Sequence, residues 1–379
     1  MRVLFDHQIF SYQAYGGASR YYAELMAVFH RTGTPAFTLG VAESPNEYLA
    51  NAAYYRGKKV AKGGTSAFLR TYLRNEIATL AAARRYEHDI LHATFYDPGV
   101  LRNRRGAKLV VTVLDMIPEH FPEFFDTSGW YGRLVTKRWI EGKRTLCERA
   151  DAILAISEHT KQDVVAFYGI DPSRITVTHL GNKLTVGADQ PRPAGVPARY
   201  VLFVGTRNTY KNWQLFIEAI APLIAGDPEL GVLCTGGGPF TPGELELLAA
   251  AGIADRVVQR NVRDDELAAV YAHAAAFVFP SRYEGFGIPI LEAFACGCPA
   301  VLANASCFPE IAGDAALYFE PTDRDMLREQ LKRLLGDPDL HAQLRAKGLA
   351  RSRPFTWEAT AERTLDVYRT ITTRSREAA

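Results

Sequence analysis

Short apolar runs rich in β-forming residues alternate with longer helical patterns along this chain of 379 residues. Such alternation is typical of parallel sheets covered by helices on both faces. The runs form two series: residues 2–5, 89–92, 108–114, 152–156 and 175–178, and then 200–204, 231–235, 257–259, 276–280, 300–303 and 316–319. The sequence therefore predicts an α/β protein with two sheets.

A segment that breaks regular structure separates the two series. Residues 183–199 contain Gly187, Pro191, Pro193, Gly195 and Pro197, a composition typical of a linker. The length also exceeds that of most single domains. We predict two Rossmann-like domains, residues 1–190 and 191–355, followed by a helical pattern in residues 356–379. Two such domains imply a cleft, and in these sheets ligands collect at the carboxyl ends of the strands.

Composition narrows the class of protein. Hydrophobic residues make up 47% and charged residues 23%, as in soluble globular proteins. Asp6 and His7 interrupt the N-terminal apolar run that a signal peptide needs, and no run approaches the roughly 18 apolar residues of a spanning helix. We expect a cytoplasmic protein. The five cysteines are odd in number and lack the spacing of a zinc site, so we expect small buried residues.

The net charge of +2 conceals an asymmetry. Residues 1–195 contain 25 basic and 19 acidic residues. Within this half, residues 56–85 contain eight basic residues but only one acidic residue, Glu76. A basic face attracts phosphates, whether of an anionic membrane or of a phosphorylated acceptor, although an ordinary solvated surface explains the charges equally well. No nucleic-acid-binding motif accompanies them, so we expect no nucleic-acid partner.

The most informative segment is residues 277–301, FVFPSRYEGFGIPILEAFACGCPAV. An apolar strand ends at Pro280, a glycine-containing loop follows, and Pro289 stands where a first helical residue is expected. Glu284 then lies in the loop and Glu292 in the first turns of the helix. Their carboxylates can accept hydrogen bonds from sugar and ribose hydroxyls. The alternative is a solvated loop acid and an acid favoured near a helix N-terminus.

The loop between the two glutamates offers backbone groups to a ligand. Gly285 and Gly287 allow a ligand to approach closely, and the N–H groups of Gly287 and Ile288 open the helix, where phosphate oxygens bind. We predict that Gly285, Phe286, Gly287 and Ile288 contact a phosphorylated ligand together with the two glutamates.

Two basic residues follow the first strand of the second series. The loop after residues 200–204 carries Arg207 and Lys211 and precedes a helix that starts near Asn212. The helix dipole and both cations can act there on one anion, such as a leaving diphosphate. Basic residues in loops are more often solvent contacts, but their place after a strand favours a ligand site.

A double glycine, Gly16 and Gly17, lies between the first strand and a helical run. Their unhindered N–H groups can meet a diphosphate from the N-terminal domain. The GxGxxG pattern of a dinucleotide site is absent there, which argues against an NAD-dependent oxidoreductase.

Taken together, these segments resemble the retaining glycosyltransferases of family 4, which have the GT-B fold and a Glu-x7-Glu motif. The resemblance covers nearly the whole chain and includes YGGASRYYAEL, LAISEHTKQDV, FVGTRNTYKN and SCFPEIAGDAALYFEPTD. It implies that Glu292 binds the ribose, that Glu284 lies beside the transferred sugar and its phosphate, and that Arg207 and Lys211 hold the diphosphate. Many relatives carry an arginine just before this lysine, where this chain has Tyr210, so the partner of each phosphate stays open.

The resemblance also implies roles for residues of the N-terminal domain. His92 corresponds to a histidine that faces the transferred sugar. Asp115 stands in the place of the aspartate of a Val-His-Asp pattern, here with Leu114 instead of the histidine, and is expected to orient the acceptor. Tyr15 and Tyr21 lie near the double glycine as candidate acceptor contacts, with core packing as the alternative. The C-terminal helical run is expected to pack on the N-terminal domain.

The implied chemistry is metal-independent transfer with retention, in which the departing phosphate helps to remove the acceptor proton. No cofactor is expected. The two Asp-x-Asp pairs, Asp323/Asp325 and Asp337/Asp339, stand at predicted helix starts, so we interpret them as caps.

The resemblance favours GDP-mannose or a related GDP-sugar as donor. The acceptor would be a glycan or a polyprenyl-diphosphate-linked glycan of surface polysaccharide or O-antigen assembly. Contact with the inner face of the membrane is a further expectation, because the helical run from 130 to 149 mixes apolar and basic residues. Three alternatives stay open. The donor could be a UDP-sugar. The protein could bind nucleotide sugars without transferring them, or it could be a nucleotide-sugar isomerase, which would need no acceptor.

Overall fold

The structure, a computed structural model, describes residues 1–125, 129–186, 191–207 and 209–377. The chain forms two compact units: unit 1 comprises Met1–Gly181 and Trp357–Ala379, and unit 2 comprises Asn182–Thr356. The division therefore falls at residue 181 rather than at 190. Residues 187–190 of the expected linker lie outside the described residues.

Unit 1 is built on a six-stranded parallel sheet with the order β2-β1-β5-β6-β7-β8. The strands are β1 (Arg2–Phe5), β2 (Ala36–Leu39), β5 (Ile90–Ala93), β6 (Lys108–Val113), β7 (Ala152–Ala155) and β8 (Ile175–Val177). β5 and β7 are buried over their whole length because helices cover both faces. Strand β2 was not predicted from the sequence. It is the edge strand, and none of its residues is fully buried.

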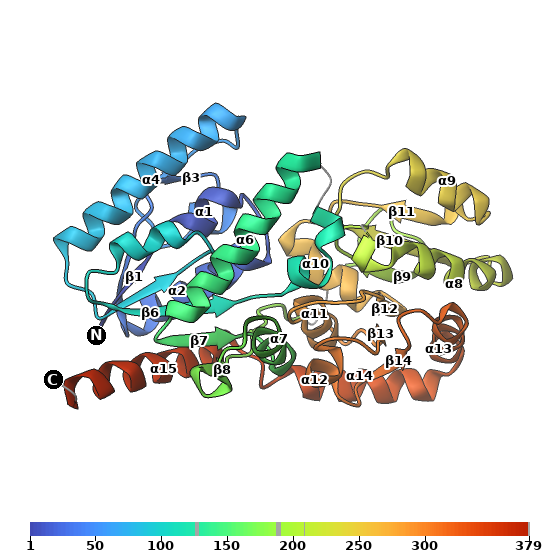
Figure 1. Ribbon diagram of the computed structural model, residues 1–379. Helices are drawn as coiled ribbons and strands as arrows, with labels where there is room; N and C mark the ends of the chain where they lie inside the picture. The colour runs from blue at the N-terminus through green and yellow to red at the C-terminus, as the bar shows by residue number, and fades with distance from the viewer. Residues whose placement is uncertain (126–128, 187–190, 208, 378–379) are drawn as a thin grey trace. The chain divides into compact units, whose positions relative to one another are not determined.

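The helices of unit 1 include one from the far end of the sequence. They are α1 (Gln8–Tyr12), α2 (Gly17–Thr32), α3 (Glu47–Ala50), α4 (Thr65–Arg85), α5 (Ile117–His120), α6 (Gly129–Arg149), α7 (Glu158–Tyr168) and α15 (Trp357–Glu377). A small sheet joins β3 (Glu43–Ser44) to β4 (Lys58–Lys59). Figure 1 shows α15, in red, beside the blue and green elements of unit 1; it packs on α2 and β7.

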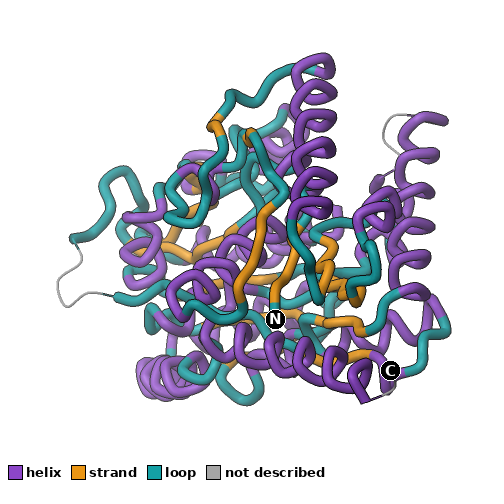
Figure 2. The backbone as a smooth tube through the Cα atoms, turned by 90° about the vertical axis from the view of Figure 1, so that its left-hand side faces the viewer, coloured by secondary structure: helices purple, strands orange, loops and turns teal. Residues whose placement is uncertain are grey.

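Unit 2 repeats the same architecture with the strand order β11-β10-β9-β12-β13-β14, again all parallel. The strands are β9 (Arg199–Val204), β10 (Leu230–Thr235), β11 (Val257–Gln259), β12 (Ala276–Phe279), β13 (Ala300–Ala303) and β14 (Ala316–Phe319). The helices are α8 (Trp213–Gly226), α9 (Pro242–Ala250), α10 (Asp264–Ala272), α11 (Ile288–Ala295), α12 (Phe308–Ala312), α13 (Arg324–Gly336) and α14 (Pro338–Ser352). In Figure 2, in which the left-hand side of Figure 1 faces the viewer, strands drawn in orange run between helices drawn in purple.

Local features of the sequence explain several element boundaries. Asp323 accepts a hydrogen bond from Met326 N (2.8 Å), and Asp337 accepts hydrogen bonds from Asp339 N and Leu340 N (both 3.0 Å). Both therefore cap α13 and α14, as predicted. All five cysteines are buried, also as predicted, and burial raises the pKa of the Cys147 and Cys296 thiols to about 12. Among the described helices, none is both long and apolar enough to cross a bilayer.

Candidate functional site

The carboxyl ends of two neighbouring strands of unit 2 bring Lys211 and Glu284 together. Lys211 follows β9 at the end of a short 3₁₀ turn, Thr209–Lys211, and Glu284 lies in the loop between β12 and α11. β9 and β12 pair directly, with Val201 opposite Ala276. A hydrogen bond from Arg282 N to Tyr210 O (2.8 Å) ties the two loops, and Lys211 Nζ forms an ion pair with Glu284 Oε1. Lys211 and Glu284 thus come together because β9 and β12 are neighbours in the sheet.

Aromatic rings and a second loop hold the pair in place. Lys211 Nζ lies 5.1 Å from the centre of the Phe279 ring, and its side chain is only 11% exposed. Glu284 N donates to Ser306 Oγ (3.2 Å), and Cys307 Sγ donates to Glu284 O (3.2 Å). The ammonium and carboxylate are therefore fixed at the edge of the sheet. No role was predicted from the sequence for Ser306, Cys307 or Phe279, although Ser306 and Cys307 follow the end of β13.

The glycine-containing loop ends at the N-terminus of α11. Gly287 has φ +87°, a conformation that favours glycine, and a Cβ there would lie 3.0 Å from Ile290 Cδ1. The helix begins at Ile288, one residue before Pro289, where the sequence predicted its start. Gly285 and Phe286 are buried, and Phe286 packs edge-on against Phe355 at 6.1 Å. The N–H groups at the start of α11 thus lie in the same loop as Glu284.

Glu292 lies within α11 and is 3% exposed. Its Oε2 accepts a hydrogen bond from the Tyr271 hydroxyl of α10 (3.2 Å). Burial, and then the negative charge of Glu292, raise the pKa of Tyr271 well above its usual value, so the phenol stays a hydrogen-bond donor. The structure therefore shows a buried partner for Glu292, and its contact with a ribose stays a prediction.

Arg207 takes a different position from the one expected for an exposed loop residue. Its side chain is 1% exposed. The guanidinium donates to Glu244 Oε1 (2.7 Å) and to three carbonyls of the loop after β10, those of Gly236 (3.1 Å), Gly238 (2.8 Å) and Pro239 (3.0 Å). Burial alone would raise the pKa of Glu244, but the Thr241 N–H and Arg207 outweigh burial and hold it below its usual value. Arg207 thus supports the 236–239 loop, and its contact with a diphosphate stays a prediction.

We expect the change Arg207→Ala to lower the free energy of unfolding of unit 2 by about 3 kcal/mol, because it leaves Glu244 and three carbonyls without their buried donor. Urea-induced unfolding measures the loss. Glu244→Gln keeps an acceptor for Arg207 Nε and should cost clearly less. Equal losses in the two variants would contradict the central role of the guanidinium.

In unit 1 the double glycine and Asp115 lie after β1 and β6. Gly16 precedes the first residue of α2, and Ser19 N of that helix already donates to Gln13 Oε1 (3.1 Å). Gly17 is exposed. Asp115 is partly buried; its Oδ1 accepts from Ile117 N (3.1 Å) and its carbonyl accepts from Lys143 Nζ (2.9 Å). Tyr15 is 63% exposed and stacks on Tyr48 at 5.1 Å. These residues stay candidates for ligand contacts.

His92 and Tyr21, by contrast, belong to the core of unit 1, and both are fully buried. His92 Nδ1 hydrogen-bonds the Tyr368 hydroxyl of α15, and Nε2 hydrogen-bonds Thr112 Oγ1 (2.8 Å). The Tyr21 hydroxyl reaches the same Thr112 Oγ1 at 3.2 Å. This placement corrects the expectations that His92 faces the sugar and that Tyr21 contacts the acceptor, because neither side chain reaches the surface.

Burial lowers the pKa of His92 to about 3, so the ring is neutral in the folded protein. An unfolded histidine has a pKa near 6.5 and binds a proton at a higher pH. We therefore expect this histidine to lower the free energy of unfolding by about 1.4 kcal/mol for each unit that the pH falls from 6.5 towards 3. Urea unfolding of the protein and of His92→Gln at pH 7 and pH 5.5 tests this. Identical pH slopes in the two proteins would contradict it.

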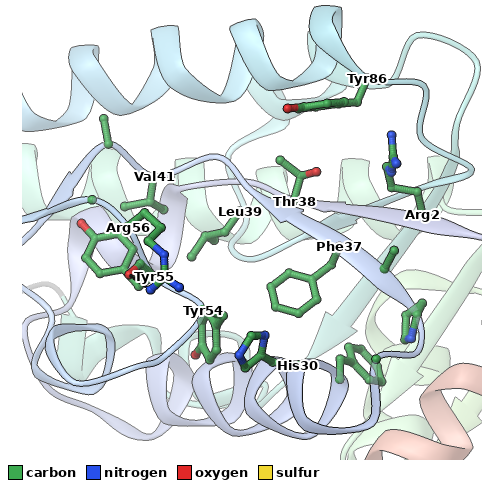
Figure 3. Close-up of a pocket in the computed structure, with 16 residues that line it drawn as sticks. Arg2, His30, Phe37, Thr38, Leu39, Val41, Tyr54, Tyr55, Arg56 and Tyr86 are labelled. Carbon is green, nitrogen blue, oxygen red and sulfur yellow. Dashed lines mark hydrogen bonds between the residues drawn. The ribbon is translucent and has the colours of Figure 1, made fainter.

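A pocket of about 870 Å³ in unit 1 is lined by residues of the edge strand and of segments near it. Figure 3 shows that its wall contains Phe37, Thr38 and Leu39 of the edge strand β2, with Tyr54 and Tyr86 on other segments. None of the residues predicted above to bind a ligand lines this pocket.

Two Rossmann-like units, each with a six-stranded parallel sheet, are the architecture of GT-B glycosyltransferases. Residues 198–337 match the family described as "Glycosyl transferases group 1", and residues 15–184 match "Glycosyltransferase Family 4". The chain belongs to glycosyltransferase family 4 and is a glycosyltransferase.

Relatives of known function support this membership. The chain is 30% identical over 302 residues to "MMP alpha-(1->4)-mannosyltransferase" of Mycolicibacterium hassiacum, an alignment that covers 77% of this chain and 72% of the relative. It is 30% identical over 239 residues to "O-antigen chain mannosyltransferase B" of Escherichia coli, covering 59% and 62% of the two chains. A "D-inositol 3-phosphate glycosyltransferase" of Corynebacterium efficiens is 28% identical, covering 89% and 86%.

Solved structures agree with the fold. The sucrose-phosphate synthase of Thermosynechococcus elongatus has a TM-score of 0.73 at 20% identity, covering 98% of this chain and 99% of that chain. Anabaena HepE in complex with UDP-glucose has a TM-score of 0.72 at 17% identity, covering 98% and 100%. At these identities the likeness establishes the GT-B fold.

Proposed function

We propose that this protein transfers a mannosyl unit, with retention of anomeric configuration, from GDP-mannose or a related GDP-sugar to a glycan or lipid-linked glycan of surface polysaccharide assembly. The observation that carries the proposal is the Lys211–Glu284 pair at the adjoining ends of β9 and β12, beside the N-terminus of α11. Two mannosyltransferases among the relatives support the choice of sugar.

The chemistry of transfer follows from charge. When the bond from the sugar to the diphosphate breaks, negative charge grows on the diphosphate. The Lys211 ammonium and the N–H groups at the start of α11 can stabilise this charge, while Glu284 accepts hydrogen bonds from sugar hydroxyls. The departing phosphate takes the acceptor proton on the same face, which retains the configuration. These residues supply positive charge and N–H donors at the diphosphate, so we propose transfer without a metal ion or cofactor.

A donor panel tests the proposal. Calorimetry with GDP, UDP and ADP and with their sugar nucleotides, on the wild type and on Glu292→Gln, should give selective binding of GDP that the variant weakens. Selective binding of UDP would make a UDP-sugar the donor instead of a GDP-sugar. Selective binding of one nucleotide sugar without turnover on any acceptor would favour the alternative of a binding protein. Binding of no nucleotide would refute the proposal.

Two further measurements test the chemistry of transfer. NMR of the first-formed product distinguishes retention from inversion of the anomeric configuration. The transfer assay repeated in EDTA tests whether transfer is independent of metal ions.

We propose further that unit 1 attaches to the inner face of the membrane, where a polyprenyl-diphosphate-linked acceptor would lie. Leu69, Leu73 and Ile77 on α4 are 51%, 57% and 67% exposed. Their spacing of four places them on one face of the helix, next to Arg70 and Arg74. Aliphatic side chains flanked by arginines suit an anionic interface.

Flotation with vesicles checks this attachment. The wild type should float with vesicles that contain anionic phospholipid and stay behind with neutral ones, and Leu73→Ser with Ile77→Ser should reduce flotation. Leu245→Ser on α9, a residue that is 50% exposed in unit 2, is the matched control. Equal flotation of both variants, or none by the wild type, would remove the membrane from the proposal.

A further inference from the structure

Three side chains that can ligate a metal converge in unit 1, on helices that carry none of the predicted donor-site residues. His120 ends α5, and His159 and Asp163 lie on α7. His120 Nε2 lies 3.1 Å from Asp163 Oδ1, and His159 Nε2 lies 3.6 Å from Asp163 Oδ2. One potential ligand atom from each of the three side chains lies within 4.8 Å of the others. The cluster thus contains two imidazoles and one carboxylate.

Both helices hold these side chains in fixed positions. His159 and Asp163 are four residues apart and therefore share one face of α7. Ser157 caps this helix by accepting a hydrogen bond from Thr160 N (3.0 Å). The His120 ring packs edge-on against Phe167, another residue of α7, at 4.9 Å and 84°. The cluster therefore rests on packing as well as on charge.

We propose that His120, His159 and Asp163 bind a divalent transition-metal ion, zinc foremost. Imidazole nitrogens and a carboxylate oxygen are ligands that zinc accepts, with water in the fourth position. Two ligand atoms at tetrahedral angles about zinc lie about 3.3 Å apart, given zinc-to-ligand distances near 2.0–2.1 Å. His120 Nε2 lies 3.1 Å from Asp163 Oδ1 and His159 Nε2 lies 3.6 Å from Asp163 Oδ2, so each imidazole has one carboxylate oxygen near this distance. The imidazole side chains, 29% and 32% exposed, leave a path for the ion.

The buried lysine beside α5 is neutralised by its own acidic partner. The adjacent Lys143 is paired with Glu119 at 3.0 Å, and both side chains are almost fully buried. Glu119 also accepts a hydrogen bond from the Tyr168 hydroxyl. The positive charge of Lys143 is thus balanced within α5 and α6 themselves.

A metal ion bound to these three side chains would link α5 to α7. α5 directly follows Asp115, whose carboxylate accepts a hydrogen bond from Ile117 N at the start of that helix. An ion on His120 would hold this segment, on which a predicted acceptor residue lies. The ion has no part in the transfer chemistry proposed above, which rests on residues of unit 2, so the two proposals can fail separately.

Zinc binding to the full-length, untagged chain tests the proposal after dialysis against a chelator. Calorimetry should show one equivalent bound, and cobalt(II) should give the visible absorption of a low-coordinate site. His159→Ala and Asp163→Asn should each weaken zinc binding by about tenfold or more, since even changes outside the ligand set cost 10–100-fold. His341→Ala on α14 is the matched control and should bind zinc like the wild type.

Thermal unfolding without metal establishes that each variant is folded, and with zinc the wild type should unfold at a higher temperature while His159→Ala should not. Two results would overturn the proposal. One is the absence of stoichiometric zinc or cobalt binding by the wild type, which would leave the three side chains as an ion-paired cluster. The other is equal binding by the wild type and by both ligand variants, which would place the metal elsewhere.

Discussion

Lys211→Ala should reduce kcat/KM for the donor by about 10²–10³-fold, the loss typical of a single group that stabilises developing negative charge. The variant removes the ammonium beside the leaving diphosphate. It also leaves the Glu284 carboxylate, whose side chain is only 14% exposed, without its ion-pair partner. An unpaired carboxylate there repels the diphosphate, so donor binding should weaken as well. Steady-state kinetics with the nucleotide sugar measure both effects.

Two variants separate the role of the ammonium from general damage. Lys211→Arg keeps the positive charge in a larger, planar group and should retain part of the activity. Lys347→Ala breaks another lysine–carboxylate pair of unit 2, that with Asp314 (2.8 Å), which lies at the surface, and should change neither kinetics nor stability noticeably. Wild-type activity of a folded Lys211→Ala protein would exclude the lysine from the transfer step.

His92→Ala should lower the free energy of unfolding of unit 1 by about 2–4 kcal/mol, while the folded enzyme keeps its kcat. The change removes a fully buried ring, leaves the Tyr368 hydroxyl without this partner, and takes from the Thr112 hydroxyl one of its two partners, the other being Tyr21. Urea unfolding gives the stability, and assays well below the unfolding temperature give kcat.

Tyr368→Phe serves as the comparison, because it removes only the hydroxyl and should cost about 1 kcal/mol. A histidine that faces the sugar would give the opposite pattern. In that case His92→Ala would lower kcat strongly and leave stability nearly unchanged, and our placement of His92 in the core would be wrong.

Much of the fold follows from local sequence signals. All six strands of the second series were predicted at or within one residue of their bounds, because each is a compact apolar run between helices. Strand β2 was not predicted because Ala36–Leu39 is a short edge strand that follows a turn with glycine and proline, and Thr38 interrupts its apolar residues. Position in the sheet, which sequence does not reveal, decides how apolar a strand must be.

The candidate site was predictable where strand order decides the geometry. Glu284 and Lys211 both follow strands, and parallel strands place such loops at one edge of a sheet. The orientation of a side chain was not predictable. His92 lies near a strand end, yet α15, more than 260 residues further along, covers its ring and supplies a partner. Arg207 likewise follows a strand, but its guanidinium turns to Glu244 and to carbonyls of the 236–239 loop. Both outcomes depend on contacts distant in sequence.

The return of α15 to unit 1 has a consequence for the order of folding during synthesis. Unit 2 is one continuous stretch, Asn182–Thr356, so the ribosome has made all of it before α15 is made. Unit 1 is completed only then, when Tyr368 becomes available to the buried ring of His92. In a nascent chain unit 2 should therefore be able to fold completely before unit 1 does. Until α15 is synthesised, part of the core of unit 1 stays uncovered.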